Sequence, residues 1–126
     1  MRGVIYARYS PGPRQTEQSI EGQVADCKYY AEEYGIDIIE VYADRKVSGK
    51  SVVGRDEFQR MLRDAERGLF DCVLVWKIDR FGRDRQDIAL GKLTLKRAGV
   101  KLMYAKESVP EGPEGIILES VLEGLA

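Results

Sequence analysis

Short apolar runs alternate along the chain with longer stretches in which apolar residues recur every three or four positions. The short runs are rich in β-branched and aromatic residues, which favours strands at 3–9, 36–42, 72–76 and 100–105. The three- and four-residue spacing predicts helices at about 20–34, 55–67 and 84–98, and a last one from residue 114 onward. Strands that alternate with helices predict an α/β fold with a mainly parallel sheet and helices on both of its faces.

The predicted helices have recognisable ends and apolar faces. Gly35, Gly68 and Gly99 each follow a helix and lead directly into, or close to, the next strand, as C-terminal glycines do. The expected apolar face of the first helix consists of Ile20, Val24, Cys27, Ala31 and Tyr34. That of the third consists of Ile88, Ala89, Leu93 and Leu95. The polar stretch 43–54 contains two glycines and is expected to be a mobile loop.

Polar and charged residues follow the first three strands. Because the carboxyl ends of parallel strands open at one edge of a sheet, these residues are expected to gather there. They comprise one hydroxyl, six cations and one carboxylate: Ser10, Arg8, Arg45, Lys46, Arg55, Arg80, Arg83 and Asp79.

A hydroxyl among guanidinium groups suits attack on a phosphodiester, because guanidiniums match the charge and geometry of the transferring phosphoryl group. Asp79 could orient an arginine. The general base for Ser10 stays open between Asp79, a group acting through water, and the phosphate itself. Plainer interpretations remain for each residue alone: Ser10 as a turn residue, Arg80 and Arg83 as a solvated face, and Asp84 as a helix cap.

The composition narrows the class of protein. The chain has 126 residues, 44% hydrophobic and 33% charged, which suits one globular domain. The net charge of -1 argues against nucleic-acid binding by bulk charge alone. Histidine is absent, so neither a His-based triad nor a zinc site is expected, and we predict no metal and no cofactor.

Cys27 and Cys72 lie in apolar patterns and are interpreted as core residues. Without a visible signal peptide or membrane span, the expected location is the cytoplasm and no membrane partner is expected.

Four segments, in this order, carry a resemblance to one family. They are Tyr6 to Ser10, Gln18 to Gln23, Ser48–Gly49 with Arg55, and Asp79 to Asp84. Together they resemble the catalytic domain of the serine recombinases, a family of resolvases, DNA invertases and large serine integrases. The resemblance covers essentially the whole chain. The loop between Ser10 and Gln18 is longer than in small resolvases, which favours the large serine recombinase or transposon-integrase branch.

The resemblance implies a fold and a set of roles. The fold would be a three-layer α/β/α domain with a five-stranded mixed sheet, whose fifth strand would fall in 105–109. Ser10 would be the nucleophile and would form a phosphoserine link to a DNA 5′ end. The scissile phosphate would be bound by Arg8, Arg55, Arg80 and Arg83. Asp79 would position an arginine or handle a proton, and support at the active site would come from Tyr6, Gln18 and Gln23.

The resemblance also implies partners. These are double-stranded DNA carrying recombination sites, and further copies of the protein in a dimer and tetramer. The chain is interpreted as one catalytic domain, 1–126, that ends within a long dimerisation helix and lacks the DNA-binding region. We therefore do not expect this piece alone to recombine DNA. The expected subunit contact is an apolar helix face: Ile117, Leu118, Val121, Leu122 and Leu125.

Two other functions fit the same strand-end residues. One is a module that binds a phosphate or nucleotide and does no chemistry, which should tolerate Ser10→Ala. The other is a hydrolase that uses Ser10 on small phosphoesters, which an aryl phosphate would detect. The sequence indicates neither the DNA site nor the choice among integration, excision, inversion and resolution.

Overall fold

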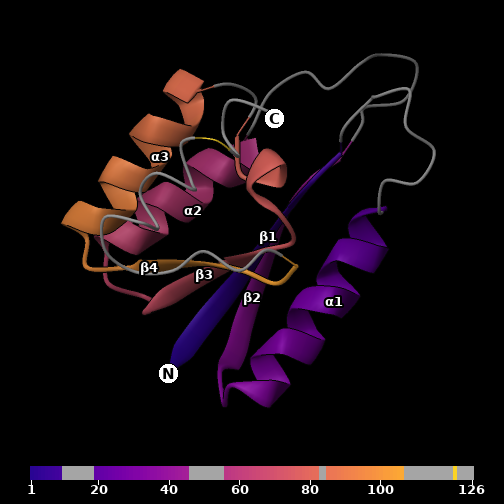
Figure 1. Cartoon of the computed structure of the whole chain (residues 1–126). Coiled ribbons are helices and arrows are strands. Elements are labelled where there is room, and N and C mark those ends of the chain that lie inside the picture. The colour runs from indigo at the N-terminus through magenta and orange to yellow at the C-terminus, as the bar shows by residue number, and fades with distance from the viewer. Residues whose placement is uncertain (10–18, 46–55, 83–84, 107–120, 122–126) are drawn as a thin grey trace.

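A computed structural model describes residues 1–9, 19–45, 56–82, 85–106 and 121 of the chain. Strands and helices alternate in it, as the hydrophobic pattern predicts (Figure 1). The strands are β1 (Arg2–Arg8), β2 (Asp37–Asp44), β3 (Cys72–Val75) and β4 (Lys101–Tyr104). The helices are α1 (Ile20–Glu33), α2 (Asp56–Glu66) and α3 (Arg85–Arg97), with a short 3-10 turn, η1 (Ile78–Arg80), after β3.

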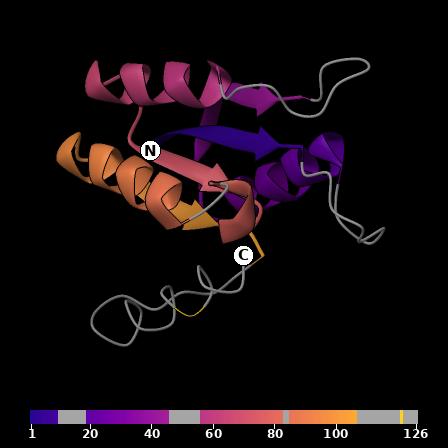
Figure 2. The same cartoon turned by 90° about the horizontal axis from the view of Figure 1, so that it is seen from above.

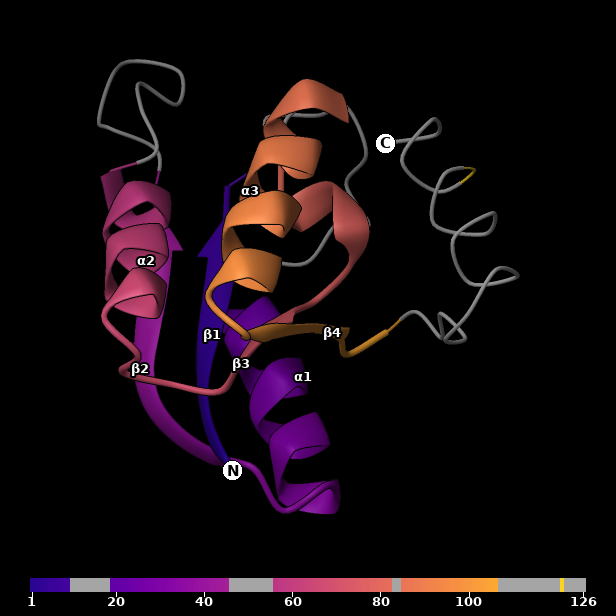
Figure 3. The same cartoon turned by 90° about the vertical axis from the view of Figure 1, so that its left-hand side faces the viewer.

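The strands form a four-stranded sheet in the order β2-β1-β3-β4, and each neighbouring pair within the described residues is parallel. Helix α1 covers one face of the sheet, and α2 and α3 lie side by side on the other (Figures 2 and 3). The predicted three-layer α/β/α fold is therefore confirmed. Residues 105 and 106 form a bend, and the remainder of the proposed fifth strand lies outside the described residues.

Alternate side chains of the central strand enter two different cores. Val4 and Tyr6 pack with side chains of α2 and α3, whereas Ile5 packs with Cys27 and Ala31 of α1. This alternation is the two-residue period of a strand that is covered on both faces. Arg8 has the same parity as Tyr6, and it closes β1 at the carboxyl edge of the sheet.

The structure corrects two of the predicted helix faces. In α1 the buried side chains include Gln23, while Tyr34 is exposed beyond the end of the helix. In α3 the buried positions are Ile88, Gly91 and Leu95, whereas Ala89 and Leu93 face outward. Both errors have one cause: apolar character was taken as the sign of burial, although a glycine and a hydrogen-bonded amide occupy buried positions here.

The strand boundaries also differ from the prediction at β2. The strand continues to Asp44, so the predicted loop begins at least two residues too early. The rest of that loop, 46–54, lies outside the described residues. Of the predicted last helix only Val121 is described; it is helical and exposed. Among the helices of the described residues, none has the length and apolar character needed to cross a membrane.

Gly91 lets α3 approach two aromatic rings closely. A Cβ atom at this position would lie 2.7 Å from Cζ of Phe58 and 2.8 Å from Cε2 of Phe81. Overpacking of this kind costs about 1–3 kcal/mol, and the higher helix propensity of alanine offsets about 1 kcal/mol of it. We therefore expect Gly91→Ala to lower the free energy of unfolding by up to about 2 kcal/mol, measured by urea denaturation followed by circular dichroism.

A neighbouring exposed position provides the control for Gly91→Ala. Leu90 is 66% exposed, so Leu90→Ala should change the free energy of unfolding by less than about 0.5 kcal/mol. A Gly91→Ala variant as stable as the unsubstituted protein would show that the two rings can move aside.

Candidate active site at the carboxyl edge of the sheet

The end of β1 is held in place by a side chain of α1. The backbone N–H of Arg8 donates a hydrogen bond to Oε1 of Gln23 at 3.3 Å, and Nε2 of Gln23 donates to the Arg8 carbonyl at 3.1 Å. The amide thus satisfies a donor and an acceptor of the same residue, as a neighbouring strand would. Ser19 caps the start of helix α1, because its side chain accepts a hydrogen bond from the N–H of Gly22 in the first turn.

The Arg8 guanidinium joins the end of β1 to the turn after β3. Its Nη2 donates to the carbonyl of Asp79 at 2.5 Å and to that of Gly82 at 3.3 Å. Its Nη1 donates to the carbonyl of Tyr9 at 3.3 Å. Only 7% of Arg8 is exposed. The structure therefore brings together two of the strand-end groups that the topology predicts to meet.

The turn after β3 carries Asp79 and Arg80 on a firmly packed backbone. Ile78 and Phe81, on either side of the pair, are both buried in the core between the sheet and helices α2 and α3. Nη1 of Arg80 lies 3.2 Å from Oδ2 of Asp79, so the two side chains form an ion pair within the turn.

Arg80 does not lie on a solvated face, the plainer interpretation of its sequence, because only 1% of it is exposed. The tight 3-10 turn and its two buried apolar neighbours draw the whole segment into the fold, and the guanidinium goes with it. Arg8 and Arg80 are thus both buried and engaged with protein groups. A phosphate could contact these guanidiniums only after the groups that bury them move aside.

Asp44, a buried carboxylate at the end of β2, is a residue of this edge that was not predicted from the sequence. Its Oδ2 accepts a hydrogen bond from the Tyr6 hydroxyl at 2.6 Å and one from the N–H of Phe58 at 3.2 Å. Its Oδ1 accepts from the N–H of Glu57 at 3.0 Å. Asp44 therefore orients Tyr6 and caps the first turn of α2, the helix that begins directly after Arg55 in the sequence. One signal in the sequence could have indicated its burial, because Asp44 has the same parity in the strand as Tyr42, which is buried. The signal was not used because the strand was predicted to end at Tyr42.

Aromatic rings connect three of the elements around this edge. The rings of Tyr6 and Phe58 lie 5.2 Å apart at a steep angle, and Phe58 makes the same kind of contact with Phe81, also at 5.2 Å. Edge-to-face contacts of this kind stabilise and orient buried rings. β1, the start of α2 and the turn after β3 are consequently fixed relative to one another.

The structure brings together Tyr6, Arg8, Gln23, Asp79 and Arg80 at the carboxyl edge of the sheet. The other predicted site residues lie outside the described residues: Ser10, Gln18, Arg55 and Arg83, with Ile117, Leu118, Leu122 and Leu125 of the expected subunit contact.

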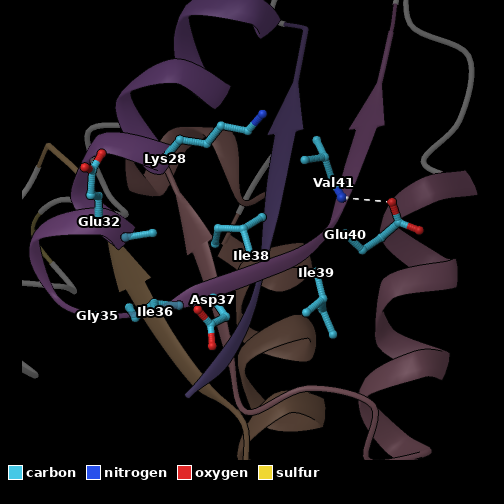
Figure 4. Close-up of a pocket in the computed structure, with 10 residues that line it drawn as sticks. Lys28, Glu32, Gly35, Ile36, Asp37, Ile38, Ile39, Glu40 and Val41 are labelled. Carbon is cyan, nitrogen blue, oxygen red and sulfur yellow. Dashed lines mark hydrogen bonds between the residues drawn. The ribbon is translucent and has the colours of Figure 1, made fainter.

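A groove elsewhere on the domain lies along α1 and the edge strand β2 (Figure 4). Lys28 and Glu32 contribute from α1, and the lining continues from Gly35 and Ile36 into the first half of β2. Since Asp44 marks the opposite end of that strand, the groove is not part of the candidate active site.

The two cysteines are free and buried. Burial raises the pKa of the Cys27 thiol to about 12, and burial also raises the pKa of Cys72. Both thiols therefore stay protonated near neutral pH and are poor nucleophiles. Among the described residues, no group of three or more histidine, cysteine, aspartate or glutamate residues could hold a metal ion.

Comparison with known proteins identifies the family. A family model described as "Resolvase, N terminal domain" matches residues 3–126, and the chain therefore belongs to this family. This membership supports, in general terms, an enzyme of site-specific recombination.

Solved structures agree with that assignment. A resolvase family site-specific recombinase from Streptococcus pneumoniae is 28% identical with a TM-score of 0.78, over 99% of this chain and 87% of that one. The N-terminal catalytic domain of TP901-1 integrase is 29% identical with a TM-score of 0.76, over 99% of this chain and 93% of that one. The C-terminal catalytic domain of ISC1926 TnpA, an IS607-like serine recombinase, is 22% identical with a TM-score of 0.66, over 96% of this chain and 78% of that one. The last of these similarities concerns the fold alone.

Proposed function

We propose that this chain is the catalytic domain of a serine site-specific DNA recombinase in which Ser10 is the nucleophile. The Ser10 hydroxyl oxygen would attack a phosphodiester and form a phosphoserine bond to the DNA 5′ end. The bond from phosphorus to the 3′ oxygen would break, and that oxygen would take up a proton. Because the new bond preserves the energy of the old one, the reverse attack by another 3′ hydroxyl rejoins the DNA without a high-energy cofactor.

The contact between Arg8 and the turn after β3 carries this proposal. It joins the strand that precedes Ser10 to the segment that holds Asp79 and Arg80. Two guanidiniums near the nucleophile would stabilise the charge of the transferring phosphoryl group. Arg55 and Arg83 would complete this set, with Gln18 beside them.

The burial of Arg8 and Arg80 favours a resting state that must rearrange before catalysis. Arg8 would release backbone carbonyls, and Arg80 would shift from Asp79 toward the phosphate. A site of this kind suits a recombinase that acts only after DNA sites and subunits have assembled into dimers and tetramers, through the apolar face of 117–125. The protein would act on DNA in the cytoplasm, encoded by a bacterium, a phage or a transposon.

Covalent trapping tests the reaction class and the nucleophile together. The full-length protein would be mixed with DNA that carries its recombination site, nicked so that the cleaved end cannot be rejoined. Mass spectrometry is expected to find a nucleotide on Ser10, and Ser10→Ala should abolish this adduct while DNA binding persists. If the protein binds the site and no adduct forms, the proposed chemistry is refuted and a phosphate-binding module becomes the better description.

A further inference from the structure

Trp76 is the only tryptophan of the chain, and it directly follows β3. It has the parity of Leu74, whose side chain packs in the core beneath α1. Its indole Nε1 accordingly reaches α1 and donates a hydrogen bond to Oδ2 of Asp26 at 2.9 Å. Its carbonyl accepts a hydrogen bond from the N–H of Lys106 at 3.0 Å. Both the backbone and the ring of Trp76 are therefore held in place.

The face of this ring lies near two cations. The guanidinium carbon of Arg80 is 5.6 Å from the ring centroid, and Nζ of Lys77 is 4.7 Å from it. The negative face of an indole attracts such groups, more strongly where water is excluded. Arg80 is almost fully buried, so the ring and the Asp79 carboxylate both act on its guanidinium with little competition from solvent.

Helix α1 holds the ends of both central strands with one of its faces. Gln23 and Asp26 are three residues apart and so lie on neighbouring turns of the same side. Gln23 binds the backbone of Arg8 at the end of β1, and Asp26 binds Trp76 just after β3. The helix thereby holds Arg8 in a fixed position relative to Trp76, and so relative to Arg80, which lies over the Trp76 ring.

We propose that Trp76, fixed by Asp26, is a positioning residue for Arg80. The ring would set the direction of the guanidinium before and during phosphoryl transfer, so this role rests on the proposed function of Arg80. A ring that only filled space would affect stability and leave the orientation of Arg80 unchanged.

The chain contains a chemically similar unit that serves as a control. The Tyr42 hydroxyl donates a hydrogen bond to Oδ2 of Asp64 at 2.7 Å, and the guanidinium carbon of Arg60 lies 4.4 Å from the centroid of the Tyr42 ring. This aspartate, aromatic and arginine unit joins β2 to α2, and none of its members belongs to the candidate active site. Tyr42→Leu and Asp64→Asn therefore match Trp76→Leu and Asp26→Asn in kind.

Two measurements test the proposal. In the free protein, the NMR residual dipolar coupling of the Arg80 Nε–H bond reports the direction of that bond, and it should change in Trp76→Leu and in Asp26→Asn because the guanidinium turns. The coupling should stay unchanged in Tyr42→Leu and Asp64→Asn. In the full-length protein on nicked site DNA, Trp76→Leu should form the Ser10 adduct at least about tenfold more slowly, with DNA affinity unchanged, as expected for a displaced catalytic group. Trp76→Phe, which keeps an aromatic face, should recover part of the rate.

The possible failures are distinguishable. If the unsubstituted protein forms an adduct and Trp76→Leu forms it equally fast, the positioning role is refuted and the proposed function stands. If the unsubstituted protein forms no adduct, the proposed function fails, and the Arg80 dipolar coupling alone decides whether Trp76 orients Arg80. An Arg80 dipolar coupling that does not change in Trp76→Leu overturns the proposal in either case.

Discussion

Replacing Arg80 by lysine is expected to slow DNA cleavage about 100- to 1,000-fold, the usual effect of losing one preorganised donor to the transition state. Lysine keeps the positive charge but loses the planar fork that pairs with Asp79 and would bind two phosphate oxygens. Because the residue is buried, lysine also disturbs the packing less than alanine would. The measurement is the rate of strand cleavage in a single turnover by the full-length protein on its site DNA.

Arg60 offers a matched control for this substitution. It also pairs with a carboxylate, with its Nε 2.8 Å from Oε2 of Glu57, but it lies on α2 outside the candidate active site. Arg60→Lys should therefore cleave DNA at the normal rate. A folded Arg80→Lys variant that cleaves as fast as Arg60→Lys would remove Arg80 from the catalytic set.

Replacing Asp44 by alanine should have the largest effect on stability. The substitution removes a helix cap, which costs about 0.5–2 kcal/mol. It also leaves the buried Tyr6 hydroxyl without its acceptor, at about 1–3 kcal/mol for a buried unsatisfied group. We expect the free energy of unfolding to fall by about 3 kcal/mol in total, a large part of the stability of a typical domain.

Urea denaturation would measure this loss, and Asp64→Ala provides the comparison. Asp64 accepts a hydrogen bond from the Tyr42 hydroxyl, as Asp44 does from Tyr6, but it lies inside α2 and does not cap its start. Asp44→Ala should therefore be the more destabilising of the two. In a double-mutant cycle, Asp44→Ala and Tyr6→Phe should couple by about 0.5–3 kcal/mol. Equal losses in the two alanine variants would show that the cap adds little, and a cycle without coupling would show that the Tyr6 contact adds little.

The hydrophobic pattern was sufficient to predict the layers and the order of the elements. Periodicity is a local property, and the two-residue and three- to four-residue periods of this chain are clear. The parallel topology also correctly predicted that Arg8 would lie near the segment of Asp79 and Arg80.

The finer structure of the site depends on contacts between residues distant in sequence. Asp44 caps a helix whose first residue lies twelve positions further along, beyond the reach of the usual local capping patterns. Asp26 looks like an ordinary polar residue of a surface helix until its partner after β3 is known. Gln23 was predicted near the site by the family resemblance alone, and its bonds to the backbone of Arg8 could not be read from the sequence. The burial of Arg80 likewise results from the turn geometry and from the packing of Ile78 and Phe81.

The order of the strands has a consequence for folding during synthesis. The central strand β1 is made first, but its partner β3 begins at Cys72, and the carbonyls that hold the Arg8 side chain belong to residues 79 and 82. Contacts so distant in sequence slow folding, because a long loop must close before they form. The candidate active site therefore takes shape late, after most of the domain has left the ribosome, and a nascent chain that stops before β3 presents an incomplete, unproductive site.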